Sequence, residues 1–236
     1  MGERLAHSWG IRTDRRSTAD DYRATLEPLF RAEGIKPGAV EGLAMCSVVP
    51  ALTEELLGLA RSFGVEALNL EPASQTVMPV AYEPPGDVGA DRIANAIAAK
   101  VAHGVPAIVV DLGTATTVDA VSRDGVYLGG AIAPGLWTSL EALLAAAAKL
   151  TGVRLRAPGN VIGRTTEEAL ASGVIYGHAA QVEGVVRRMQ RELGGKATVV
   201  GTGGAVELVA PHVHVLDEVR PHLTLEGLYH FWALSR

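Results

Sequence analysis

The segment from residue 107 to residue 121, AIVVDLGTATTVDAV, constrains the fold more than any other part of the chain. It begins with an uninterrupted apolar run that ends in the carboxylate of Asp111, and a turn of small residues leads into a second strand-like run. Short apolar runs bounded by turn residues are typical of buried strands. The segment therefore predicts a strand that presents Asp111 at its carboxyl end, followed by a second strand.

The turn after Asp111 has the residue types that phosphate recognition requires. Gly113 lets backbone N–H groups approach phosphate oxygens, and Thr114 and Thr116 add hydroxyl donors. A carboxylate at the start of such a loop can hold a metal ion that screens the phosphate charge. An ordinary hairpin turn, in which Asp111 only accepts hydrogen bonds, explains the same residues. From the residues alone, both interpretations stay open.

A second glycine turn lies near the other end of the chain, in VVGTGGAVEL. Its order of strand, turn and helix can set a helix N-terminus against an anion or a nucleotide. The glycines lack the G-x-G-x-x-G spacing of a dinucleotide-binding fingerprint. A tight strand-to-helix turn at residues 201–204 without a ligand is the alternative interpretation.

Strand-like and helix-like segments alternate along the chain, which predicts an α/β fold with mixed sheets. Ser17 and Thr18 are candidate helix N-caps, and the Asp124-Gly125 pair indicates a hairpin turn. The predicted strands are residues 5–13, 43–49, 66–70, 76–78, 107–111 and 197–202, together with the two arms of the hairpin. The predicted helices are residues 17–33, 52–63, 89–104, 139–149, 167–193, 206–210 and 225–234.

Composition excludes several classes of protein. Apolar residues make up 48% of the 236 residues, which excludes intrinsic disorder, and a net charge of −5 argues against nucleic-acid binding. The charged start lacks the apolar core of a signal peptide, and the most apolar stretch, residues 125–140, is too short to span a membrane. Cys46 is the only cysteine, which suits a reducing compartment. We expect a cytoplasmic protein without nucleic-acid or membrane partners.

Several motifs together resemble those of one enzyme family. They are GADRIAN, DLGTATTVDAV, YLGGAIAPG, EALLAAAAKL, IGRTTEEALASGVIYG and VVGTGG. The chain resembles the type III pantothenate kinases, which belong to the actin, hexokinase and Hsp70 superfamily. The resemblance implies two ribonuclease H-like domains with mixed sheets flanked by helices, here residues 1–104 and 105–236, that clamp ATP between them.

The reaction implied by the resemblance is transfer of the γ-phosphoryl group of ATP to the primary hydroxyl of pantothenate, the first step towards coenzyme A. The resemblance gives the role of catalytic base to Asp91, in GADR. A carboxylate beside Arg92 and at a helix start is well placed to accept a hydrogen bond in its charged form. An ordinary helix N-terminal aspartate that pairs with its neighbour is the alternative.

The resemblance also assigns binding residues. The substrate-contacting positions are Tyr82, Gly89, Ala90, Asp91, Arg92 and Thr166. In the family the threonine comes from the partner subunit, which implies a homodimer, although Thr165 stands where the family commonly has Asn. Gly113, Thr114 and Gly203 are assigned to ATP, and Asp111 to a monovalent cation, K⁺ or ammonium. Mg²⁺ is expected to accompany ATP.

One family pattern is absent from the sequence. The family has a D-x-G-N-T phosphate loop on its first strand, and no such pattern precedes Asp111. The start of the chain resembles the second strand of that first hairpin, so the chain as given is expected to bind ATP poorly and to phosphorylate pantothenate slowly, if at all. A non-catalytic regulatory or accessory relative, a truncated inactive form and a kinase for another acceptor, such as a sugar, are the alternatives.

His212 and His214 lie two residues apart in HVHV, a spacing that metal ligands can have. No cysteine or acidic cluster accompanies them in the sequence. Ordinary surface histidines are therefore the favoured interpretation.

Overall fold

A five-stranded mixed sheet organises the second half of the chain in the computed structural model, which describes residues 5–146 and 155–236. The strand order is β5-β4-β3-β6-β7, with β3–β4 and β4–β5 antiparallel and β3–β6 and β6–β7 parallel. The strands are β3 (Ala107–Leu112), β4 (Ala115–Val121), β5 (Tyr127–Pro134), β6 (Thr198–Thr202) and β7 (Glu218–Val219). Three antiparallel strands followed by two parallel ones form the ribonuclease H-like sheet expected for this half.

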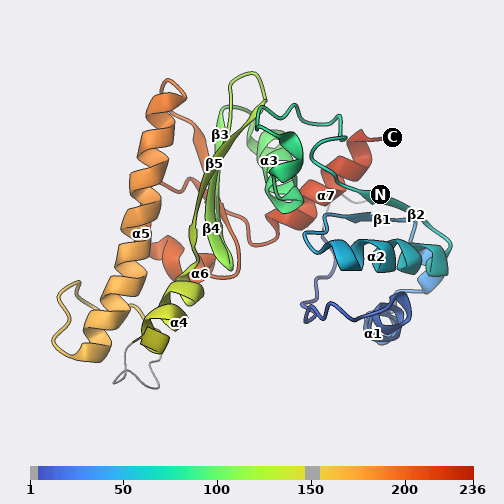
Figure 1. Cartoon of the computed structure of the whole chain (residues 1–236), viewed down its shortest axis with the longest axis horizontal. Helices are drawn as coiled ribbons and strands as arrows, with labels where there is room; N and C mark the ends of the chain where they lie inside the picture. Colours follow the sequence, from blue (N-terminus) through green and yellow to red (C-terminus); the bar gives the residue numbers. More distant parts are fainter. Residues whose placement is uncertain (1–4, 147–154) are drawn as a thin grey trace.

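Helices cover both faces of this sheet. The α3 helix (Ala90–His103) packs on the face that includes Val109 and Tyr127, and α5 (Thr166–Glu192) packs on the face that includes Ile108 and Val110 (Figure 1). Because β3 is covered on both sides, its apolar residues do not alternate with polar ones. The prediction of mixed sheets flanked by helices is confirmed.

A smaller unit precedes this sheet. Its strands β1 (Gly42–Met45) and β2 (Glu66–Asn69) are parallel and are connected through α2 (Pro50–Phe63), against which α1 (Ala19–Ala32) packs. The C-terminal helix α7 (Leu223–Leu234) returns to this unit and packs on both β1 and α3 (Figure 1). The division into domains at residue 104 stays a prediction.

Local capping signals explain where the first two helices begin and end. Thr18 and Asp21 form a capping box at the start of α1, because each side chain binds the other's backbone N–H group. Gly64 ends α2 in the left-handed conformation, with φ of 69°, that glycine adopts at little cost. Pro50 occupies the first turn of α2. The strand predicted at 43–49 ends earlier, at Met45, which pairs with the last residue of β2, Asn69.

Two predicted strands are absent. Residues 5–13 form no strand, because no neighbouring strand among the described residues offers them a hydrogen-bonding ladder. Residues 76–78 form none either, because the Gln75 side-chain amide takes both backbone groups of Met78, accepting from its N–H at 2.8 Å and donating to its carbonyl at 2.5 Å. A local side-chain bond therefore replaces the ladder.

The helices α4 (Leu136–Ala146) and α6 (Val206–Val209) agree with the predicted helices apart from their ends. The short 3₁₀ helices Pro37–Ala39 and Pro85–Asp87 were not predicted, and a third, Ala210–His212, follows α6 directly. Residues 147–149 of the helix predicted at 139–149 lie outside the described residues. The two-residue strand β7 was too short to predict, and His212 and His214 do not lie on a strand. Within the described residues, no helix has the length and apolar character needed to cross a bilayer.

Candidate active site

The N-terminus of α3 positions Asp91. Gly89 is the N-cap and Ala90 the first helical residue, and the carboxylate of Asp91 folds back so that its Oδ1 accepts a hydrogen bond from the Arg92 backbone N–H at 2.8 Å. A Cβ atom on Gly89 would lie 2.5 Å from that oxygen. A side chain at position 89 would therefore displace the Asp91 carboxylate from this position, and Asp91 Oδ2 makes no hydrogen bond within the described part of the chain.

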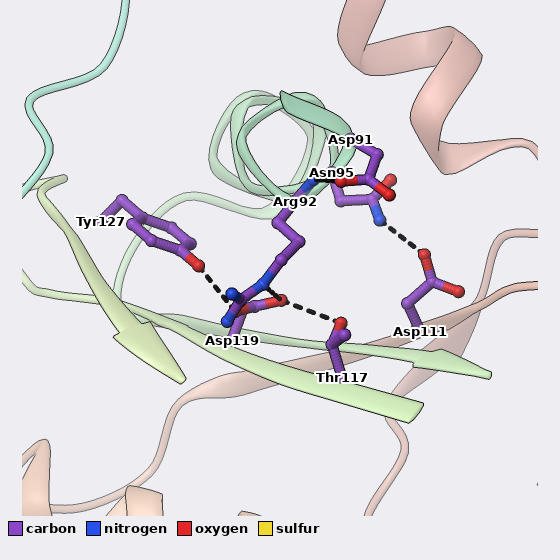
Figure 2. Close-up of polar contacts among 7 residues, drawn as sticks. All are labelled: Asp91, Arg92, Asn95, Asp111, Thr117, Asp119 and Tyr127. Atoms are coloured by element: carbon purple, nitrogen blue, oxygen red, sulfur yellow. Dashed lines mark hydrogen bonds and ion pairs between the residues drawn. The ribbon is translucent and has the colours of Figure 1, made fainter. Parts of the chain in front are cut away.

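The side chain of Arg92 points away from Asp91 and towards the sheet (Figure 2). Its Nε donates to the two carboxylate oxygens of Asp119, on β4, at 3.0 and 3.2 Å, and its Nη2 donates to Oδ1. Both side chains are almost fully buried, with 8% and 1% of their surface exposed. Asp91 therefore accepts a hydrogen bond from the backbone N–H of Arg92, while the guanidinium of Arg92 pairs with Asp119.

Two further donors hold the Asp119 carboxylate. The hydroxyl of Tyr127 donates to Oδ1 at 2.8 Å, and that of Thr117 donates to Oδ2 at 3.0 Å (Figure 2). Burial raises the pKa of Asp119, and the hydrogen bonds and charge of Arg92 oppose that rise. Burial also acts to lower the pKa of Arg92, but the bonds to Asp119 raise it overall, so the guanidinium is charged and the two groups form a buried ion pair.

Asp111 lies at the end of β3 and is tied to the helices above it (Figure 2). Its Oδ2 accepts from Asn95 Nδ2, on α3, at 2.9 Å, and Asn95 Oδ1 accepts from the Thr224 hydroxyl, on α7, at 2.7 Å. Burial raises the pKa of Asp111, the bond from Asn95 opposes this, and the negative charges of Asp91 and Asp119 add to the rise. Asp111 therefore lies within the electrostatic influence of two other carboxylates, those of Asp91 and Asp119.

The two glycine turns predicted from the sequence meet beside Asp111. Gly203 follows β6 with φ of +95°, and a Cβ atom on it would lie 2.4 Å from Asp111 Oδ1, so only glycine fits there. A Cβ atom on Gly113, in the β3–β4 turn, would lie 3.4 Å from the same oxygen. The structure thus brings together Asp111, Gly113 and Gly203, which the sequence assigned to a nucleotide and cation site.

The β3–β4 turn is held from the start of α4, where Thr138 donates a hydrogen bond to the Thr114 carbonyl at 2.8 Å. Gly135 packs closely against the same turn, since a Cβ atom on it would lie 2.3 Å from the Gly113 carbonyl oxygen. Thr114 itself is exposed. The prediction that Thr116 adds a hydroxyl to this turn is wrong, because Thr116 is buried on β4 and bonds His178 of α5 at 2.6 Å.

Tyr82 and Thr166 occupy different places relative to this group. Tyr82 packs on β5, where a Cβ atom on Gly129 would lie 3.1 Å from its ring, and it lies near enough to Arg92 to influence that residue's pKa. Thr166 is exposed at the start of α5, after the N-cap Thr165. Because α5 and α3 cover opposite faces of the sheet, Thr166 does not join Asp91 within one chain.

Sequence reasoning missed Asp119, Asn95, Tyr127 and Thr224. The signal for Asp119 was available, because it is a carboxylate inside the strand-like run TTVDAV and a buried charge requires a partner. Asn95 stood in the GADRIAN motif without a role. Tyr127 and Thr224 carried no local signal, since only the tertiary fold brings them to the site.

Acidic, histidine and cysteine side chains do not cluster as a metal site in residues 5–146 and 155–236, where no group of three or more is placed to hold an ion. Asp111 has one carboxylate oxygen, Oδ1, that makes no hydrogen bond among the described residues and lies beside the backbone of Gly113 and Gly203. Such a single oxygen ligand fits a monovalent cation, which needs fewer charged ligands than a divalent one. A cage of several carboxylates of the kind that holds Ca²⁺ is a different arrangement.

Comparisons with known proteins agree on one family. A family model for type III pantothenate kinase matches residues 1–188. The chain is 46% identical over 228 residues to a type III pantothenate kinase from Moorella thermoacetica, with 96% of this chain and 90% of that protein covered. It is 46% identical over 235 residues to one from a Roseiflexus species, with 99% and 92% covered.

A solved structure supports the fold. The crystal structure of a Baf family transcriptional activator from Campylobacter jejuni aligns with a TM-score of 0.58 at 22% sequence identity, over 88% of each chain. That likeness shows a shared fold, while the family follows from the match over most of the chain and from the identity to curated relatives. The chain belongs to the type III pantothenate kinase family.

Proposed function

We propose that this protein transfers the γ-phosphoryl group of ATP to the primary hydroxyl of pantothenate, giving 4′-phosphopantothenate, the first step of coenzyme A biosynthesis. The observation that carries the proposal is the 46% identity to type III pantothenate kinases over nearly the whole chain. The grouping of Asp91, Asp111 and the two glycine turns at one edge of the sheet supports it.

Asp91 is the catalytic base in this proposal. Its Oδ1 is held by the Arg92 backbone N–H, which leaves Oδ2 to accept the proton of the pantothenate hydroxyl. The hydroxyl oxygen then forms a bond to the γ-phosphorus as the bond from that phosphorus to the β,γ-bridging oxygen breaks, and ADP leaves. Phosphoryl transfer asks little more of the protein than such positioning and the neutralisation of charge.

Arg92 supplies the positive charge for the substrate. Pantothenate carries one carboxylate, and a guanidinium matches a carboxylate in both charge and geometry. Tyr82, Gly89 and Ala90 adjoin the start of α3 or β5 and complete this side of the site.

The nucleotide side of the site is formed by the meeting turns. Gly113, Thr114 and Gly203 contact ATP in this proposal, because glycines let backbone N–H groups reach phosphate oxygens. Asp111 would hold K⁺ or ammonium, which offsets phosphate charge when bound, and Mg²⁺ would enter with ATP.

A homodimer completes the site in this proposal. Thr166 lies on the face of the sheet opposite to α3, so a second copy must supply it if it contacts pantothenate. Exposed apolar side chains around α4 and the start of α5 support a subunit contact there, namely Trp137, Leu143, Val161 and Ile162. The lone Cys46 fits the reducing cytoplasm that we propose as its location.

The test is a direct assay with the purified chain, ATP, Mg²⁺ and K⁺. We expect ADP release that depends on pantothenate and a phosphorylated pantothenate detected by mass spectrometry. N-acetylglucosamine in place of pantothenate serves as the control acceptor. Phosphorylation of the sugar alone, or of neither compound, would contradict the proposal.

A further inference from the structure

We propose that Asp119 is a positioning residue, which fixes the Arg92 guanidinium so that its free edge faces the carboxylate of the substrate. The inference rests on the proposed function, because it concerns the same site. It assigns a role to the buried network of Arg92, Asp119, Tyr127 and Thr117 (Figure 2).

The geometry leaves part of the guanidinium unused. A guanidinium has five N–H donors on a rigid plane, and the grip of Asp119 takes the edge formed by Nε and Nη2. Nη1 has no hydrogen-bond partner among the described residues. It is also absent from their fully buried side-chain atoms that lack a partner, so it is not fully buried. The edge formed by Nη1 and Nη2 is therefore left to bind a second carboxylate.

Asp119 is itself held from several sides. Tyr127 and Thr117 donate to its two oxygens, and a Cβ atom on Gly130 would lie 2.6 Å from Oδ1, so β5 closes the remaining side. The Tyr127 ring lies in the core with no exposed surface, and Arg92 stands 5.9 Å from its centre. The Asp119 carboxylate is therefore held in one orientation, and its hydrogen bonds to Arg92 hold the guanidinium in one orientation as well.

This arrangement lowers the cost of binding the substrate. A free arginine side chain loses rotamer entropy when it binds a ligand, whereas Arg92 has already lost it on folding. The negative charge of Asp119 also makes burial of the guanidinium tolerable before any substrate arrives. A purely structural ion pair is the competing explanation, and a ligand that lacks the carboxylate distinguishes the two.

The experiment measures binding of pantothenate and of pantothenol, in which an alcohol replaces the carboxylate, by calorimetry on the full chain. Every contact at Asp119 is with a donor, and the amide in Asp119→Asn has only one acceptor oxygen, so the grip on Arg92 is lost. We expect Asp119→Asn to bind pantothenate about tenfold more weakly, with pantothenol binding unchanged. Asp124→Asn, on the exposed hairpin turn, should match wild type with both ligands.

Equal losses for the two ligands would show a structural role and overturn the proposal, as would tighter binding of pantothenate through an unmasked Arg92. If Asp119→Asn does not fold, Tyr127→Phe keeps the ring and every charge. It should weaken pantothenate binding about threefold and leave pantothenol binding unchanged, and no difference would count against the proposal.

In turnover, the Michaelis constant for pantothenate should rise in Asp119→Asn while that for ATP stays the same. Wild-type chain that discriminates between the ligands but does not phosphorylate pantothenate would refute the proposed function and leave this inference standing. Turnover of pantothenate without any effect of Asp119 would do the reverse.

Discussion

The side chains of two neighbouring residues, Asp91 and Arg92, contact different groups because of helix geometry. Consecutive residues on an α-helix point about 100° apart, so the Asp91 carboxylate stays at the start of α3 while the Arg92 guanidinium reaches Asp119 on β4. The backbone N–H between them also holds the first carboxylate in place. A helix start therefore places a carboxylate beside a guanidinium without letting the two groups pair with each other.

Replacing Asp91 with Asn tests its proposed role as the catalytic base. The amide keeps an oxygen for the Arg92 N–H but cannot take a proton from a hydroxyl, so we expect kcat to fall by a factor of about 10²–10⁴ with an unchanged melting temperature. Steady-state kinetics and thermal unfolding measure the two effects. Asp87→Asn, in the exposed turn before α3, is the matched control, and equal activity of the two variants would remove Asp91 from this role.

Gly203 offers a second residue-scale test, because its neighbour Gly204 is a built-in control. A Cβ atom on Gly203 meets Asp111 Oδ1 at 2.4 Å on a backbone with φ of +95°, whereas one on Gly204 meets nothing within 4 Å. We expect Gly203→Ala to lower the free energy of unfolding by about 1–3 kcal/mol and to weaken ATP binding. Gly204→Ala should change neither quantity in urea unfolding and nucleotide titration, and similar behaviour of the two variants would refute this account of the turn.

The site residues that could be predicted are those whose neighbours in the sequence form a recognisable pattern. Gly203 and Asp111 follow strand-like runs, so their place at the end of a sheet could be inferred from the sequence. Thr116 was misplaced because a threonine after a turn has the same local pattern whether its hydroxyl faces a ligand or, as here, a buried histidine. Thr224 was missed because 129 residues separate it from its partner Asn95.

At the scale of elements, composition identifies most of the strands but does not show which segments lack a partner strand. The β3 run lies between two helical layers, so its composition alone identifies it. Residues 5–13 have a suitable composition but no partner among the described strands, and a single segment cannot satisfy its own backbone. At residues 76–78 a glutamine side chain decided the outcome, which no periodicity rule detects.

The contact between α5 and β4 includes a buried histidine and predicts a pH effect on stability. His178 Nε2 lies 2.6 Å from the Thr116 hydroxyl, and burial lowers the pKa of His178 below its ordinary value of 6.5. Between these two pKa values the unfolded chain binds a proton that the folded chain does not, so stability is lost as the pH falls below 6.5.

His178→Gln should remove that part of the pH dependence. We expect the difference in the free energy of unfolding between about pH 7.5 and about pH 5.5 to be smaller in this variant than in wild type, measured by urea unfolding. His214→Gln, at an exposed position, is the control and should retain the wild-type difference. A difference that is unchanged in His178→Gln would show that other groups set the acid sensitivity.

At the scale of the whole molecule, the sheet itself separates the proposed substrate residues. Asp91 lies on the side of α3 and Thr166 on the side of α5, so a single copy has each residue in a different half-site. A two-fold dimer that joins them would make every site from two chains. A site made from two chains can be tested in a way that a single-chain site cannot, because a defect in Asp91 and a defect in Thr166 can be placed on different chains of one dimer.

Mixing two inactive variants tests this arrangement. In a mixed dimer of Asp91→Asn and Thr166→Ala, one site combines the intact Asp91 of one chain with the intact Thr166 of the other, and the second site carries both defects. After unfolding and refolding an equal mixture, random pairing should restore pantothenate turnover in about a quarter of all sites. Each variant refolded alone should stay at its own low activity. A mixture no more active than the average of its parents would mean that Asp91 and Thr166 act within one chain or that Thr166 has no part in the site.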